Sequence, residues 1–382
     1  MKKLFRIATV PMSLNILLKG QLKFLNQYYD LTAISGSGAD LDEVKNREGV
    51  TVHPIEIQRQ ISPVKDLISL VKLYIYFRKE KPDIIHSITP KAGLLSMIAG
   101  KLAGVPIRIH TFTGLVFPYK AGLLQKILVL MDKILCFCAT NIIPEGEGVK
   151  NDLQKYKITK KPLRIIGNGN VNGIDLDYFD PQKFTENDKG NLRQQLSINE
   201  TDFVFLFVGR LVKDKGINEL TDAFVEVNSK FSNCKLLLVG PFEQELDPVR
   251  EDVKDEINNN KNIISLGFQK DVRPYFAIAD AFVFPSHREG FPNVVLQAGA
   301  MGLFSIVTDI SGSNEIVKNG INGQIISVNN KTELALALKD VLENKEPVQL
   351  IRSNCRSAIK GFDQIFVWDC IKNEYDNIVA IE

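Results

Sequence analysis

The segment FVFPSHREGFPNVVLQA, residues 282–298, is the strongest indication of the fold. It starts with a short apolar run, passes through a loop that contains Gly and Pro, and continues with a helical pattern from Asn293. A strand that leads directly into a helix is the building unit of a parallel, doubly wound sheet. The first N–H groups of such a helix point toward a ligand beyond the strand end. The segment therefore predicts an α/β fold with a ligand site at this turn.

The same alternation of strand and helix runs through both halves of the 382-residue chain. A polar stretch at 180–200 separates the halves, so we expect two Rossmann-like, doubly wound domains that face each other across a cleft. The expected domains are residues 1–185 and 186–360, followed by a terminal segment at 361–382. The expected strands are 4–10, 29–35, 52–55, 84–87, 107–111, 141–143, 203–208, 235–239, 263–266, 281–284, 305–308 and 323–326.

The composition is that of a folded protein, with 45% hydrophobic and 24% charged residues. The first 180 residues carry 25 Lys and Arg against 16 Asp and Glu. This excess indicates either an anionic partner, such as a phosphate or a membrane surface, or a solvated basic face. Charged residues interrupt the longest apolar stretch, 123–139, so we expect no membrane-spanning helix. We also expect a cytoplasmic location, no nucleic-acid partner, and no metal site among the scattered cysteines.

The segment FLFVGRLVKDKG, residues 205–216, is a second strand that ends in a candidate phosphate loop. Gly209 allows close approach of a ligand to the backbone, and the Arg210 guanidinium can donate two hydrogen bonds to phosphate oxygens. Lys215 adds a positive charge at a helix entrance. Taken alone, these basic residues could equally be a solvated strand end.

The loop and helix of 282–298 add groups that suit a nucleotide-linked sugar. Asn293 and Val294 lie at the helix start, where free N–H groups and the helix dipole favour a diphosphate. Glu289 precedes the turn and can accept hydrogen bonds from sugar hydroxyls. Gln297, two turns further on, can reach a ribose diol.

Four motifs occur in order along the chain. Because of them, the chain resembles the retaining glycosyltransferases of family 4, which have the GT-B fold. The resemblance extends over nearly the whole chain and implies that the C-terminal domain holds the donor nucleotide. The motifs are 172–175 (NGID), 209–216, 266–268 (LGF) and Glu289 to Gln297. The donor-binding residues that it implies are Gly209, Arg210, Lys215, Phe268, Phe291, Pro292, Asn293, Val294 and Gln297.

The resemblance implies a transfer of sugar from a nucleoside diphosphate, expected to be UDP, to an acceptor hydroxyl with retention of configuration. The expected catalytic residues are Glu289, His110, Arg210 and Lys215. No cofactor or metal is expected, because side-chain cations would stabilise the leaving diphosphate. Similar proteins extend lipid-diphosphate-linked saccharides in surface-polysaccharide synthesis, and their terminal segment returns to the N-terminal domain.

Two departures from the family pattern stand out. Gln297 replaces the second Glu of the family pair, and residues 10–14 (VPMSL) replace the usual Gly-Gly loop. In that first half, Ser13, Thr89 and Lys91 are the expected acceptor contacts, although Thr89 and Lys91 also fit a capped helix start.

The Leu-rich helix at 123–135 is expected to face the core by default. Its alternative is a face on the inner surface of the cell membrane. Two other functions also stay open: a UDP-sugar epimerase of similar fold, or a non-catalytic subunit that binds a nucleotide sugar.

Overall fold

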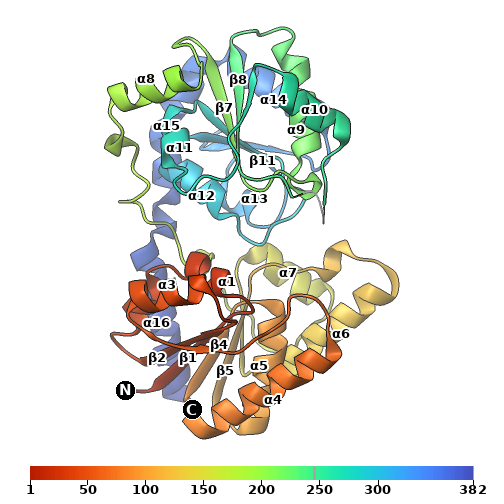
Figure 1. Ribbon diagram of the computed structural model, residues 1–382, viewed down its shortest axis with the longest axis vertical. Coiled ribbons are helices and arrows are strands. Elements are labelled where there is room, and N and C mark those ends of the chain that lie inside the picture. Colours follow the sequence, from red (N-terminus) through yellow and green to blue (C-terminus); the bar gives the residue numbers. More distant parts are fainter. Residues whose placement is uncertain (244–246, 382) are drawn as a thin grey trace. The chain divides into compact units, whose positions relative to one another are not determined.

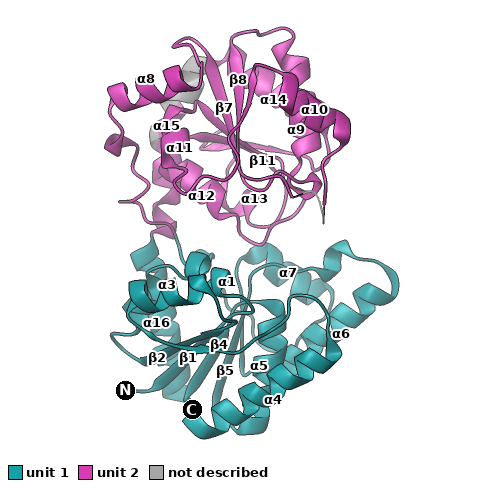
Figure 2. Cartoon of the chain, viewed as in Figure 1, with its two compact units in different colours: residues 1–173, 364–382 teal, residues 174–363 magenta. Residues whose placement is uncertain are grey.

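The computed structural model describes residues 1–243 and 247–381. The chain divides into two compact units, shown in Figure 2. Unit 1 contains residues 1–173 together with 364–382, and unit 2 contains residues 174–363. Each unit has its own parallel sheet and its own hydrophobic core.

Unit 1 has a six-stranded sheet in the order β3-β2-β1-β4-β5-β6, and every strand pair in it is parallel. Helices join successive strands, as Figure 1 shows. The strands are β1 (Lys3–Ile7), β2 (Asp30–Ser35), β3 (Thr51–Pro54), β4 (Ile84–Ser87), β5 (Ile107–Phe112) and β6 (Asn141–Pro144). The helices are α1 (Pro11–Leu17), α2 (Gln21–Leu25), α3 (Ala39–Glu48), α4 (Pro63–Glu80), α5 (Pro90–Ala103), α6 (Gly122–Cys138), α7 (Glu147–Lys155) and α16 (Gln364–Ile381).

Unit 2 repeats this topology in the order β12-β11-β10-β7-β8-β9, again with parallel pairs only. Its central strand, β7, is buried along its whole length, as a strand covered on both faces must be. The strands are β7 (Phe203–Val208), β8 (Cys234–Val239), β9 (Ile263–Ser265), β10 (Ala281–Phe284), β11 (Phe304–Thr308) and β12 (Gly323–Ile326). The helices are α8 (Glu186–Gln195), α9 (Ile217–Asn228), α10 (Glu251–Asn259), α11 (Arg273–Ile278), α12 (Asn293–Ala300), α13 (Ser313–Ile316), α14 (Lys331–Glu343) and α15 (Lys345–Ile359).

Both sheets confirm the predicted doubly wound α/β class. The strand order reverses between β1 and β4 in unit 1 and between β7 and β10 in unit 2. Ligands of such sheets bind beyond the carboxyl ends of the strands at this reversal. The topology therefore marks one candidate site in each unit.

The first unit ends earlier than the predicted boundary at residue 185. Residues 174–185 lie in unit 2, because Ile174 N donates to Phe362 O at 2.8 Å and the Ile174 and Phe179 side chains join the core of that unit. After Asp363 the chain returns to unit 1 through α16. There Trp368 Nε1 donates to Asn172 Oδ1 at 2.7 Å, and Tyr375 OH accepts from the buried Arg6 guanidinium at 2.6 Å.

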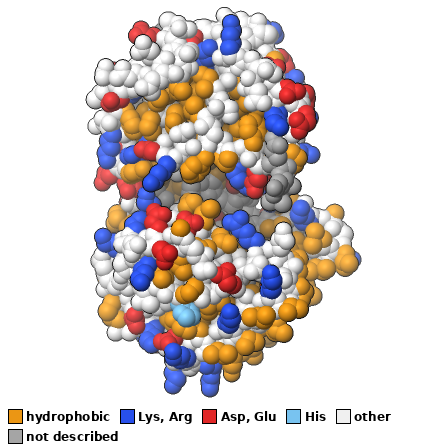
Figure 3. Space-filling model, in the orientation of Figure 1, with side chains coloured by type: hydrophobic (Ala, Val, Ile, Leu, Met, Phe, Trp, Pro, Cys, Tyr) orange, Lys and Arg blue, Asp and Glu red, His pale blue; other side chains and the backbone are white. Residues whose placement is uncertain are grey.

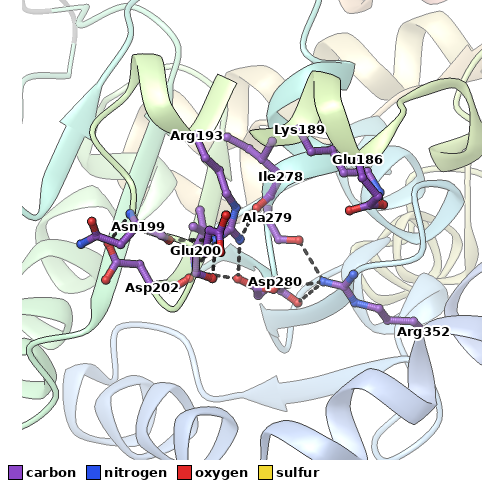
Figure 4. Close-up of polar contacts among 11 residues, drawn as sticks. Glu186, Lys189, Arg193, Asn199, Glu200, Asp202, Ile278, Ala279, Asp280 and Arg352 are labelled. Carbon is purple, nitrogen blue, oxygen red and sulfur yellow. Dashed lines mark hydrogen bonds and ion pairs between the residues drawn. The ribbon is translucent and has the colours of Figure 1, made fainter. Parts of the chain in front are cut away.

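A charged cluster around Asp280 attaches two helices to the sheet of unit 2 (Figure 4). Asp280 Oδ2 accepts from Val204 N of β7 at 2.9 Å and from Arg193 Nη2 of α8 at 3.1 Å. Arg352 of α15 donates to Ala279 O at 2.9 Å and lies 3.4 Å from Asp280 Oδ1. One carboxylate therefore connects α8, α15 and β7 at the start of β10.

Asp280→Asn should lower the free energy of unfolding by about 1–3 kcal/mol, because its hydrogen bonds from charged donors lose one of their charges. Urea titration followed by circular dichroism measures the change. Glu186→Gln on α8 is the control, since it removes an exposed ion pair with Lys189 and one first-turn carboxylate and should lower stability less than Asp280→Asn does. Equal stabilities of the two variants would contradict the role given to Asp280.

Candidate active site

Two loops meet at the strand reversal of unit 2. Residues 209–216 follow β7, and residues 285–292 follow the neighbouring strand β10. Gly216 packs against the Pro285 carbonyl with a φ of 71°, and an added methyl group there would collide with that carbonyl. A side chain at position 216 would therefore push the loops apart.

Lys215 and Glu289, one from each loop, form an ion pair. Their side chains are 16% and 18% exposed, so the pair lies mostly out of bulk water. Ser286 Oγ lies 3.2 Å from Glu289 Oε1 and fixes the same carboxylate. The predicted phosphate-binding cation and the predicted sugar-binding carboxylate thus share one small site.

Asp214 joins these loops and was not predicted as a site residue. Its carbonyl accepts from His287 N at 2.9 Å, and its carboxylate accepts from Arg288 Nε at 2.6 Å. Its own N–H donates to Asp247 Oδ2 at 2.7 Å. The sequence signal is an acidic residue between Lys213 and Lys215, where a carboxylate can bind loop donors.

Arg210 extends from the carboxyl end of β7 and leaves 56% of its side chain exposed. It pairs with Glu243, which follows β8. The contribution of such an exposed pair to stability is small. The guanidinium can therefore exchange this partner for an anionic ligand at little cost in stability.

The predicted nucleotide contacts occupy the start of α12 and the loop after β9. The positive end of the α12 dipole faces the loop. Pro292 at the N-cap of this helix has no side-chain oxygen that could cap the first turn. Gln297 Oε1 is buried with no hydrogen-bond partner among the described residues. Such a group is costly unless a ligand or water satisfies it.

The two predicted aromatic contacts have different surroundings. Phe268 is 75% exposed after β9, so its ring is available for a base. The Phe291 ring packs against Phe362 in the core, with a centroid distance of 5.5 Å. Only the backbone of Phe291 is therefore available to a ligand.

The strand reversal of unit 1 brings together Thr9 after β1 and Thr89 after β4. Their hydroxyls lie 2.7 Å apart, and Thr9 N donates to Thr89 Oγ1 at 2.8 Å. Thr89 is the N-cap of α5, but its side chain makes no cap hydrogen bond. Its hydroxyl therefore joins two strand ends, and the hydroxyl of Thr9 accepts instead from Ala92 N in the first turn of α5 at 3.2 Å.

A pocket of about 380 Å³ opens beside these threonines, and all three predicted acceptor residues, Ser13, Thr89 and Lys91, line it. Lys91 forms an ion pair of 2.7 Å with Asp66 of α4. The remaining lining is mostly apolar, from α5, the loop after β5, and α6. It comprises Val10, Ile61, Pro90, Leu94, Phe112, Gly114, Leu115, Val116, Phe117, Leu128 and Met131, with Thr9, Arg59 and Asp132 as polar members.

His110 on β5 is fully buried and does not line this pocket. Ser87 Oγ lies 2.8 Å from His110 Nδ1, and Nε2 has no hydrogen-bond partner among the described residues. Burial lowers the pKa of His110 to about 3, so the imidazole is neutral near pH 7. Its predicted catalytic role stays a prediction.

The Leu-rich helix α6 faces the core with one side only, through residues such as Leu135 and Cys136. Leu123, Leu124, Ile127, Leu130 and Phe137 are all exposed, because only one side of the helix packs on the unit. Helix α4 likewise exposes several apolar residues, and Figure 3 shows hydrophobic side chains along this edge of unit 1. The exposed residues on α4 are Val64, Leu67, Ile68, Val71, Tyr74 and Ile75.

Within residues 1–243 and 247–381, no three His, Cys, Asp or Glu side chains are grouped so that they could hold a metal ion. None of the helices in these ranges has the length and apolar character needed to cross a membrane.

Two family models match the chain. The model "Glycosyl transferase 4-like" covers residues 6–145, and "Glycosyl transferases group 1" covers residues 188–358. The second match contains both loops at the strand reversal of unit 2.

Similar proteins include two curated bacterial enzymes. The capsular polysaccharide biosynthesis glycosyltransferase CapM of Staphylococcus aureus is 33% identical over 99% of this chain and 98% of its own length. The UDP-Gal:α-D-GlcNAc-diphosphoundecaprenol α-1,3-galactosyltransferase of Escherichia coli is 29% identical over 93% of this chain and 91% of its own length.

Among solved structures, Anabaena Alr3699/HepE in complex with UDP and glucose has a TM-score of 0.82 to this chain. It is 19% identical over 99% of this chain and 100% of its own. At this identity the likeness concerns the fold.

Asp132 should make stability depend on pH. Burial raises the pKa of its carboxyl from 3.8 to about 7, so folding disfavours the ionised form. Stability is then lost as pH rises from about 4 to 7, and the penalty is complete above that range. Asp132→Asn should raise the unfolding temperature at pH 8 and leave it nearly unchanged at pH 4.

The exposed Asp42→Asn on α3 serves as the control in the same thermal scans. A shift of equal size at both pH values for Asp132→Asn would show that its carboxyl titrates normally.

Proposed function

The chain belongs to the group 1 and 4-like glycosyl transferases with the GT-B fold, and from this membership we propose its donor, acceptor and stereochemistry. The proposed reaction transfers a sugar from a UDP-linked donor to a lipid-diphosphate-linked saccharide, with retention of configuration. It would serve surface-polysaccharide synthesis on the cytoplasmic side of the membrane.

The observation that carries the proposal is the Lys215–Glu289 pair at the strand reversal of unit 2. A cation for the donor diphosphate and a carboxylate for the sugar hydroxyls lie together beside the uncapped start of α12. Donor binding would replace their mutual ion pair with ligand contacts. Lys215 then faces the diphosphate, and Glu289 holds the transferring sugar.

The proposed chemistry needs no strong protein base. As the bond between sugar and diphosphate breaks, negative charge grows on the leaving oxygen, and Arg210, Lys215 and the α12 dipole stabilise it. The same leaving group accepts the proton of the attacking acceptor hydroxyl on the front face of the sugar. We propose that these groups act without a metal ion.

The donor and acceptor assignments draw support from the relatives. The Escherichia coli relative uses UDP-Gal and acts on a diphosphoundecaprenol-linked sugar, and the Anabaena structure contains UDP. In this chain the unsatisfied Gln297 Oε1 would accept a ribose hydroxyl, and the exposed Phe268 ring would contact the base.

We propose that unit 1 meets the acceptor at the membrane surface. The exposed apolar faces of α4 and α6 carry interspersed lysines, among them Lys65, Lys72 and Lys126. Apolar residues of this kind insert at the lipid boundary, while lysines favour anionic headgroups. Such contact would be peripheral and would bring the lipid-linked acceptor to the pocket of unit 1.

A transfer assay tests the function directly. Radiolabelled UDP-sugars are incubated with the full chain and a bacterial lipid extract, and label is sought in the lipid phase. Free epimerised sugar without lipid label would favour the epimerase, and donor binding without any product would favour the non-catalytic alternative.

Glu289→Gln should lower kcat by about a hundredfold, because the contact to the sugar strengthens as positive charge develops in the transition state. Gln297→Glu should change mainly KM for the donor, because ribose does not move during transfer. Steady-state kinetics with a saturating donor separates the two effects. A large kcat loss in Gln297→Glu with none in Glu289→Gln would reverse the assigned roles.

EDTA should leave the transfer rate nearly unchanged, because Arg210 and Lys215 supply the positive charge that a metal ion would provide. Initial rates with and without chelator measure this, with magnesium and manganese added back separately. Loss of activity that either metal restores would refute the metal-free proposal.

A further inference from the structure

The pocket of unit 1 has two chemically different halves. Near the ends of β1 and β4 its lining is polar, with the hydroxyls of Thr9, Ser13 and Thr89 and the cations Arg59 and Lys91. Away from the strands, between α5 and α6, its lining is aliphatic and aromatic, with Leu94, Leu115, Phe117, Leu128 and Met131. Its volume of about 380 Å³ lies within the range of small-molecule sites.

From this division we infer that the apolar half binds the first isoprenoid units of the acceptor's lipid, while the polar half holds the attached diphosphate. The inference rests on the proposed function and specifies how its acceptor is recognised. An amphiphile that joins an anionic group directly to a hydrocarbon chain matches both halves of the pocket.

The charges of the polar half favour an anion. Lys91 Nζ already donates to Asp66 and to the Gln60 carbonyl, and its third N–H is left for a phosphate oxygen. Arg59 is an exposed residue on the pocket wall. A guanidinium and an ammonium together suit phosphate oxygens.

The apolar half disfavours a sugar as its occupant. A saccharide needs several hydrogen-bonding groups, and the only ionisable side chain on this part of the wall is Asp132 of α6. Burial raises the pKa of that carboxyl to about 7, so a large fraction is uncharged near neutral pH and tolerates hydrocarbon beside it.

Helix α6 also gives the chain a route to the lipid surface. Leu128 and Met131 line the pocket, while Ile127 and Leu130, their neighbours in sequence, are exposed on the same helix. One helix thus contributes both to the apolar half of the pocket and to the face that we propose for the membrane.

Farnesyl diphosphate, which has three isoprenoid units and no sugar, is the probe. It is titrated into the full chain below its micelle-forming concentration, and binding is measured by calorimetry. We expect its affinity to be at least about tenfold higher than that of inorganic diphosphate, because only the prenyl chain buries apolar surface. Dodecylphosphocholine, with a chain but no net charge, should also bind at least about tenfold more weakly.

Leu94→Trp should fill the apolar half and remove the preference for farnesyl diphosphate, while the affinity for inorganic diphosphate is kept. Leu102→Trp is the matched control, because Leu102 lies on the same helix but is exposed, and it should behave as the unmodified chain does. UDP binding, measured in parallel, should be the same in all three proteins and reports on unit 2.

Equal affinities of the unmodified chain for farnesyl and inorganic diphosphate would overturn the inference, and this comparison needs no variant to fold. Equal binding of dodecylphosphocholine would overturn the diphosphate assignment. Prenyl selectivity without any transfer to lipid extracts would leave the pocket assignment standing and refute the proposed function. Transfer to lipid extracts with an unchanged acceptor KM in Leu94→Trp would leave the proposed function standing and refute the pocket assignment.

Discussion

The site of unit 2 depends on the connection between the loops that follow β7 and β10. Asp214 binds the second loop through its carbonyl and its carboxylate, and Lys215 next to it pairs with Glu289. Because β7 and β10 are neighbours in a rigid parallel sheet, the loops start from fixed positions and need only these few contacts to hold their geometry. The charges of the candidate site are thus held in place by local hydrogen bonds, at the point where the strand order reverses.

Unit 1 uses the same sheet topology with different chemistry at the reversal. Where unit 2 has an ion pair, unit 1 has two threonine hydroxyls, and an apolar pocket lies beside them. Duplicated architecture therefore does not imply duplicated function, because the groups at the strand ends decide what binds. Cations and a carboxylate suit a charged nucleotide sugar, whereas hydroxyls beside hydrocarbon suit an amphiphile.

Local patterns were sufficient to predict the fold, since all twelve expected strands occur and the two sheets are parallel. The positions of the two site loops were also predictable, because residues 209–216 and 285–292 directly follow strand signals. Contacts between residues distant in sequence could not be predicted from local patterns. The unit boundary depends on a hydrogen bond between Ile174 and Phe362, and Asp214 acts through partners more than thirty residues away. The hydrophobic period of α6 marks a helix, but it does not tell which apolar face is covered.

The amide of Gln297 has a consequence for the end of the catalytic cycle. Where the family pattern has a carboxylate, this chain has a neutral group near the proposed nucleotide. A nucleoside diphosphate product carries more negative charge than the intact donor, and in the proposed site it would meet one repulsive charge fewer. Departure of the product would then be slower than from a site with two carboxylates, so turnover would be sensitive to accumulating UDP and to any enzyme that removes it.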